Sequence, residues 1–216
     1  LGPYRYDFSH DLIRSVVYHD LSPLRRQTIH LQLGGALEQL YAGQLEKIVE
    51  WLAHHYHCGY EPTKALHYLQ RAGQQAQSIY ALPLALEHYQ QALTYWEQLY
   101  HPSNIQVPTD AWRQRWDLLL SQAEVRRMLG QFKSQGPALA TVAQEVTDWG
   151  DDRDRLRLLE EQIAQLEHTP ALDQRRQLAK EGLHLARRLA DTLAEGNFLQ
   201  AWADCDRDMA NHSEAL

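Results

Sequence analysis

Histidine and cysteine side chains are concentrated in one short segment of this 216-residue chain. The segment contains His54, His55, His57 and Cys58. His54 and Cys58 are four residues apart and would share one face of a helix, which His67 on the next helix could approach. Imidazole and thiolate are ligands that Zn²⁺ prefers. Because no CxxC or HExxH spacing is present, we favour a packing role, with a metal-binding or metal-dependent module at the His54–Cys58 cluster as the alternative.

No pairing of a nucleophile with a base indicates an enzyme. Neither Cys58 nor Cys205 lies in a recognisable motif, and no GxSxG nucleophile elbow occurs. The acidic pairs at 151–152 and 160–161 are typical of solvated helix starts. A GxxxxGK[ST] phosphate loop is also missing from the sequence. We expect no catalytic residue, no bound metal, no cofactor and no disulfide.

The overall composition is that of a globular protein with an acidic balance. Apolar residues make up 44% and charged residues 23%, which is far from the composition of disordered chains. A net charge of −7 argues against direct nucleic-acid binding, because phosphate backbones would be repelled. No apolar run reaches the roughly 18 to 20 residues that span a bilayer, and no signal-peptide pattern is seen. These features favour a cytoplasmic protein without membrane contact.

The elements that position these side chains are expected to be almost entirely helical. A short strand over 4–8 is followed by a helix over 11–20 and by a second helix that starts at Ser22-Pro23 and runs to about 41. Further helices are expected over 44–57, 62–79, 82–99, 110–130, 137–148, 153–168, 173–190 and 193–209.

Internal similarity predicts how these helices associate. The segments 65–72 and 85–93 carry small residues at corresponding places. In a tetratricopeptide register, Gly73, Ala85 and Ala92 occupy small-residue positions and Tyr89 a bulky one. An irregular repeat follows from residue 119, and the first helix of another, cut short, begins near residue 199. The sequence therefore predicts an all-α superhelix of tetratricopeptide-like repeats over 44–216, truncated at its C-terminus.

Several segments together resemble a known family. They are Phe8–Arg14, Leu21–Arg26 with His30, Trp51–Tyr56 and Ala65–Ala92. They look like the junction between winged-helix and tetratricopeptide regions of STAND (AP-ATPase type) signal-transduction ATPases, whose bacterial members include transcriptional activators. The resemblance covers residues 4–94 and implies that 1–43 is the end of a winged-helix domain with its connecting helix. It further implies that the chain is a piece of a longer ATPase.

The same resemblance assigns roles to His10 and Asp11. His10 matches the histidine that reaches nucleotide phosphates in the closed state, with Asp11 as its support, so the parent protein would bind ATP or ADP. On the alternative interpretation, Ser9 caps the helix, Asp11 interacts with the helix dipole and His10 is an ordinary surface residue. In this chain alone the sensor has no nucleotide to read, because the phosphate loop is missing.

The remaining candidate is a recognition surface on the concave face of the predicted superhelix. Its outward positions are His67, Gln70, Gln74, Gln77, Glu124, Arg127, Asp204 and Arg207. Lys and Arg do not dominate this set, which favours a protein, peptide or small effector with mixed polar contacts. We expect a non-catalytic sensor arm of a signalling ATPase, probing effectors for a bacterial transcriptional regulator. The alternatives are a merely solvated face and a passive, self-associating scaffold.

Overall fold

The computed structural model describes residues 11–100, 107–131, 136–167 and 169–214, and within these ranges all regular structure is helical. The α-helices are α1 (Asp11–Asp20), α2 (Pro23–Leu40), α3 (Val49–Gly59), α4 (Pro62–Ser78), α5 (Leu82–Leu99), α6 (Thr109–Met128), α7 (Gly136–Trp149), α8 (Asp152–Leu166), α9 (Leu172–Leu189) and α10 (Thr192–Glu214). A 3-10 helix, η1 (Leu45–Ile48), precedes α3. The all-α prediction is confirmed for the described residues, whereas the strand predicted over 4–8 lies outside them.

Local sequence signals explain where several helices begin. The Ser22 hydroxyl accepts a hydrogen bond from the Arg25 backbone N–H, and Pro23 occupies the first turn of α2. Glu61 caps α4 in the same way, again followed by a proline. Asp151 and Asp154 form a reciprocal capping box at the start of α8. Capping thus fixes the helix starts that the sequence predicted at Pro23 and Pro62.

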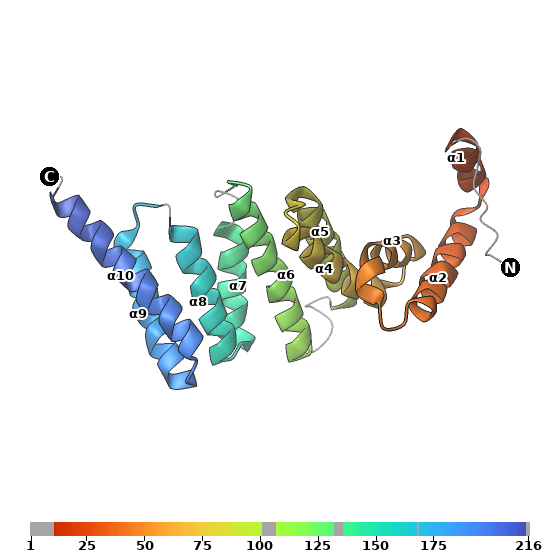
Figure 1. Ribbon diagram of the computed structural model, residues 1–216. Coiled ribbons are helices and arrows are strands. Elements are labelled where there is room, and N and C mark those ends of the chain that lie inside the picture. Colours follow the sequence, from red (N-terminus) through yellow and green to blue (C-terminus); the bar gives the residue numbers. More distant parts are fainter. Residues whose placement is uncertain (1–10, 101–106, 132–135, 168, 215–216) are drawn as a thin grey trace.

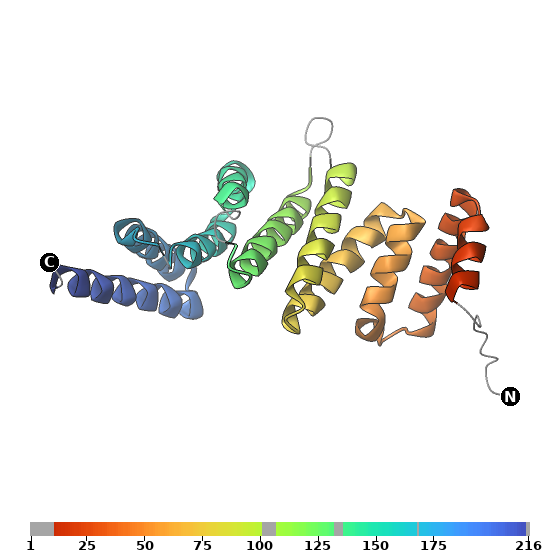
Figure 2. The same ribbon diagram turned by 90° about the horizontal axis from the view of Figure 1, so that it is seen from above.

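The helices follow one another along an elongated molecule, with α1 and α10 at opposite ends (Figure 1). The view from above shows the helices in the same order along the molecule (Figure 2). Each helix packs mainly on its neighbours in sequence, from α2 on α3 through to α9 on α10. Contacts are therefore local, and the described parts of the chain do not gather around one central core.

Polar contacts connect every second helix, and we call α2, α4, α6, α8 and α10 the even-helix row. These contacts are Lys64 and Tyr68 with Glu38, Gln114 with Gln70, Gln77 with Glu124, Arg113 with Asp154, Arg157 with Asp117, and Asn197 with Glu160. In the intervening helices, His88 and Tyr95 of α5 contact Glu50 and His57 of α3. The described chain therefore alternates between one line of helices and the other.

Close helix packing depends on a few glycines that face large side chains. A Cβ on Gly73 would lie 2.5 Å from Cε1 of Tyr89, and one on Gly182 would overlap the ring of Phe198. Gly59 is the last residue of α3, and a Cβ there would lie 2.8 Å from Cδ2 of Leu31. The left-handed conformation after the helix belongs to Tyr60 at φ 58°. Gly59 thus serves packing, and the left-handed residue that ends the helix is Tyr60.

The buried apolar side chains form two clusters. The larger cluster extends from Ile48 in η1 to Leu158 in α8, and the smaller one joins α8, α9 and α10 around Phe198. Helix α8 belongs to both, because Leu158 packs in the larger cluster while Leu156 and Leu159 pack in the smaller one. Helix α8 therefore connects the two apolar clusters.

Helix α1 carries an apolar face that the described residues leave uncovered. Ile13, Val16 and Val17 recur at helical spacing, yet they are 45%, 60% and 47% exposed. Leu24 at the start of α2 is 73% exposed. Apolar surface of this kind commonly marks a contact with another protein surface.

Candidate functional site

The predicted recognition surface maps onto α4, α6 and α10 of the even-helix row. On α4, His67 and Gln74 are exposed, whereas Gln70 and Gln77 are half-buried. Glu124 and Arg127 of α6 are also half-buried. Of these residues, Gln77 of α4 and Glu124 of α6 are in direct contact.

A chain of hydrogen bonds crosses from the core to this surface. The buried Tyr89 hydroxyl donates to Oε1 of Gln77 at 2.9 Å, and Nε2 of Gln77 donates to Oε2 of Glu124 at 2.8 Å. Gln114 of α6 donates to Gln70 at 2.9 Å. The polar side chains are thus held in place by one another, which limits the entropy that they would lose on binding a partner.

The structure adds Glu161 of α8, which sequence reasoning missed. Burial raises the pKa of Glu161, and the Glu124 carboxylate raises it further, while Arg127 and Arg157 act in the opposite direction. The acidic pair at 160–161 is typical of a helix start, but Glu161 lies in the second half of α8. We call Gln70, Gln74, Gln77, Glu124, Arg127 and Glu161 the central polar surface.

The two predicted residues on α10 lie at the C-terminal end of the even-helix row, away from the central polar surface. Asp204 and Arg207 form an ion pair with each other at 2.9 Å. Asp204 also lines a small cavity of about 250 Å³ between α8, α9 and α10. The pair lies on α10, whose main packing partner is α9, so the predicted surface consists of a central part and a separate C-terminal part.

The histidine-rich segment forms a different arrangement from the predicted one. His57 turns toward α5, where the Tyr95 hydroxyl lies 3.1 Å from its Nδ1. His67, predicted to approach from the next helix, instead lies against Tyr68 on its own helix. Its place is taken by His30 of α2, which is 25 residues from its partner His55 in sequence and therefore invisible to local spacing.

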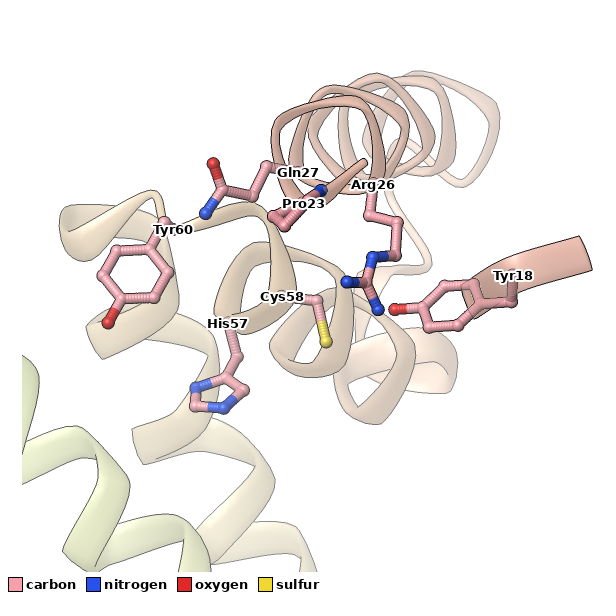
Figure 3. Close-up of a pocket in the computed structure, with 7 residues that line it drawn as sticks. All are labelled: Tyr18, Pro23, Arg26, Gln27, His57, Cys58 and Tyr60. Carbon is pink, nitrogen blue, oxygen red and sulfur yellow. The ribbon is translucent and has the colours of Figure 1, made fainter. Parts of the chain in front are cut away.

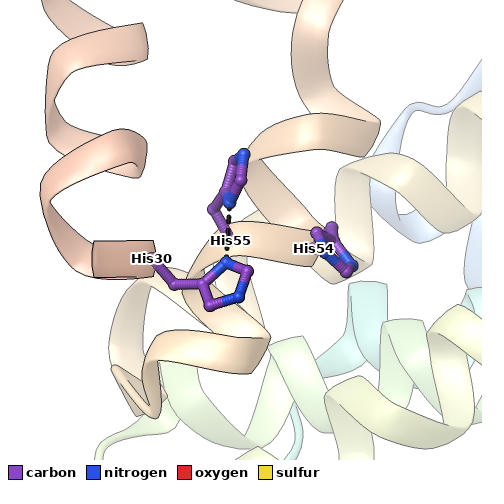
Figure 4. Close-up of side chains that lie close together, drawn as sticks. All are labelled: His30, His54 and His55. Atoms are coloured by element: carbon purple, nitrogen blue, oxygen red, sulfur yellow. Dashed lines mark hydrogen bonds between the residues drawn. The ribbon is translucent and has the colours of Figure 1, made fainter. Parts of the chain in front are cut away.

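His30, His54 and His55 form a compact cluster between α2 and α3. Each offers one nitrogen, and these nitrogens all lie within 4.8 Å of one another. Nδ1 of His30 is 2.9 Å from Nδ1 of His55, as Figure 4 shows, with His54 beside them on the same helix as His55. Within the described part of the chain, this is the one group of His, Cys, Asp or Glu side chains that is compact enough to hold a metal ion.

A shallow cavity adjoins this cluster where the end of α3 meets α1 and α2. It is lined by Tyr18, Pro23, Arg26, Gln27, His57, Cys58 and Tyr60, and the Cys58 thiol points into it (Figure 3). The predicted pair is present, because the Cys58 sulfur lies 3.9 Å from both ring nitrogens of His54. Burial raises the pKa of Cys58, which keeps the thiol protonated and does not favour nucleophilic catalysis.

The two residues of the nucleotide-sensing hypothesis cannot be placed as a pair. His10 lies outside the described residues, and Asp11 is described only as the first residue of α1. Their roles therefore stay predictions. Within the described ranges, no helix combines the length and the apolar content that crossing a bilayer requires.

Comparison of the chain with protein-family models, with curated proteins and with solved structures finds no match. The geometry of the two candidate sites therefore carries what can be inferred about function.

Proposed function

We propose that this chain is a non-catalytic binding arm that recognises a protein, peptide or small effector through the central polar surface. The observation that carries the proposal is the hydrogen-bonded path from Tyr89 through Gln77 to Glu124, because it preorganises polar groups on successive helices of one row. Mixed acid, base and amide groups suit a partner with mixed polar contacts better than they suit a single carboxylate or phosphate.

The architecture proposed for this arm is a tetratricopeptide-like superhelix. The alternation of helices between two lines, the burial of Ala85, Tyr89 and Ala92, and the fit of Tyr89 against Gly73 all support the repeat register. In such an array the first helices of successive repeats line one face. The even-helix row supplies these first helices, including α10 at the C-terminal end.

The parent protein that we propose is a STAND-type signalling ATPase of bacterial origin, acting as a transcriptional regulator. This part rests on the resemblance of residues 4–94 and is supported by the uncovered apolar face of α1, which suits a helix at the edge of a larger domain. The chain itself would not bind ATP, since its sequence contains no phosphate loop. Calorimetric titration with ATP should therefore show no heat of binding, and micromolar affinity would contradict this assignment.

Peptides selected from a random display library against the wild-type chain provide the test of the binding surface. Fluorescence anisotropy should show that Glu124→Lys and Arg127→Glu each weaken a selected peptide at least about tenfold, the loss expected for a removed charged contact. Glu97→Lys is the control, because Glu97 is exposed and lies on α5, which is not part of the even-helix row. Peptides that bind all three variants like the wild type, or a selection that enriches none, would contradict the proposal.

A passive scaffold that only self-associates is the competing function. Light scattering across protein concentration separates the two, because a scaffold of that kind increases in mass with concentration and a binding arm does so only with its partner.

A further inference from the structure

The histidine cluster between α2 and α3 has the composition of a metal site, and we propose that His30, His54 and His55 bind a divalent transition-metal ion of the Zn²⁺ class. Imidazole nitrogen is a preferred ligand of Zn²⁺, Cu²⁺ and Ni²⁺, and three histidines with one open position are an established zinc ligand set. The proposal is independent of the central polar surface on α4, α6 and α8.

The distances among the ligand atoms fit one ion after small side-chain rotations. Tetrahedral coordination at about 2.0 to 2.1 Å places two ligand nitrogens roughly 3.3 Å apart. Nδ1 of His30 and Nδ1 of His55 lie 2.9 Å apart and share a hydrogen bond in the metal-free protein. An ion that replaces the shared proton needs these rings to separate by a few tenths of an ångström, and the nitrogen of His54 within 4.8 Å completes the set.

The surroundings of His30 provide the partner that a metal-bound histidine requires. Its Nε2 lies 3.0 Å from the Tyr18 hydroxyl. When Nδ1 of His30 binds the ion, the Nε2–H donates to the Tyr18 oxygen, which fixes the tautomer and the ring orientation. Tyr18 is therefore a positioning residue.

Burial across the cluster leaves the ion a way in. His30 is 7% exposed, His55 is half-buried and His54 is exposed, so the site is closed on the α2 side and open toward solvent at His54. A solvent molecule takes the fourth position.

A bound ion would also connect two different helices. His30 lies in the middle of α2, while His54 and His55 lie in α3. Because the ion binds only the folded arrangement, it should raise the midpoint of thermal unfolding.

The test uses the full chain stripped with a chelator and titrated with Zn²⁺ by calorimetry and with Co²⁺ by absorption spectroscopy. The wild type should bind one equivalent with micromolar or tighter affinity, and its unfolding midpoint should rise with Zn²⁺. His54→Ala and His55→Ala should each weaken binding more than about 100-fold, and Tyr18→Phe by about 10- to 100-fold, the range for an outer partner. His54 is exposed, so its replacement leaves the core intact, which circular dichroism verifies.

Two controls separate this site from adventitious binding. His184→Ala, at an exposed histidine of α9, should leave affinity and stoichiometry unchanged. Cys58→Ser should also leave the affinity unchanged, because the thiol is not among the three ligands. No uptake by the wild type, uptake unaffected by His54→Ala and His55→Ala, or a loss with Cys58→Ser as large as with His54→Ala would overturn the proposal.

Discussion

The ring of Tyr89 fills the space that a side chain on Gly73 would need, since a Cβ at position 73 would lie 2.5 Å from Cε1 of the tyrosine. Tyr89 is 1% exposed, and its hydroxyl is held by Gln77, so the ring has little freedom to move away. This contact joins α4 to α5 and at the same time supports the central polar surface.

The first prediction concerns Gly73→Ala, with Gly35→Ala as its control. Both glycines lie inside helices, so alanine gains about 1 kcal/mol of helix propensity at either position. A Cβ on Gly35 meets nothing within 4 Å. Overpacking against Tyr89 should make Gly73→Ala less stable than Gly35→Ala by about 1 to 3 kcal/mol, measured by urea unfolding. An equal gain in the free energy of unfolding for both variants would show that α4 and α5 can move apart at little cost.

The second prediction compares Ala92→Trp with Gln74→Ala. Ala92 is fully buried between helices, and an indole there should lower the free energy of unfolding by about 1 to 3 kcal/mol or more. Gln74 is exposed, so its replacement should change that quantity by no more than about 0.5 kcal/mol. Thermal melts followed by circular dichroism measure both. If the tryptophan variant melts like the wild type while the alanine variant is crippled, the repeat register is wrong.

The third prediction concerns Glu161 and pH. Its folded-state pKa is raised by burial and by Glu124, so stability is fully present below the ordinary glutamate pKa of 4.5 and is lost as pH rises through the folded value. Glu161→Gln removes this loss. The variant should be more stable than the wild type near pH 7 and should lose that advantage near about pH 4. Urea unfolding at both pH values measures this, with Glu97→Gln as control; an advantage independent of pH would exclude the carboxylate as its cause.

The fourth prediction concerns the histidine cluster without metal. Burial lowers the pKa of His30 and His55 below 6.5, with neighbouring His54 as a further cause for both. Stability is therefore present above that value and is lost as pH falls through the lowered folded values. In a chelator, the wild type should lose more stability between about pH 7.5 and 5.5 than His55→Gln. Urea unfolding detects the difference, and equal slopes would show that the ring is free to charge.

Helix positions were predictable from sequence because their signals are local. Ser22 and Pro23 start a helix through hydrogen bonds within four residues. The spacing of the small residues at 73, 85 and 92 indicates close packing of helices. The repeat register near Tyr89 could be predicted from the residues of a single helix pair.

The candidate sites were less predictable because they join different helices. His30 meets His55 across 25 residues, and Glu161 interacts with Glu124 across two helices, so neither pairing has a signature in spacing. The metal alternative drawn from the sequence took His54 and Cys58 with His67 as a possible further ligand, whereas the structure brings His30 to His54 and His55. Side-chain direction, which sequence does not specify, decided between the two histidines.

Helix α8 contributes Leu158 to one apolar cluster and Leu156 with Leu159 to the other. Cooperativity between the two ends of the molecule must therefore pass through a single helix. Amide hydrogens of α9 and α10 should exchange together as one unit, at a free energy of opening different from that of α3 to α6. The packing of Leu158 therefore sets how strongly local unfolding of α9 and α10 is coupled to unfolding of the larger cluster.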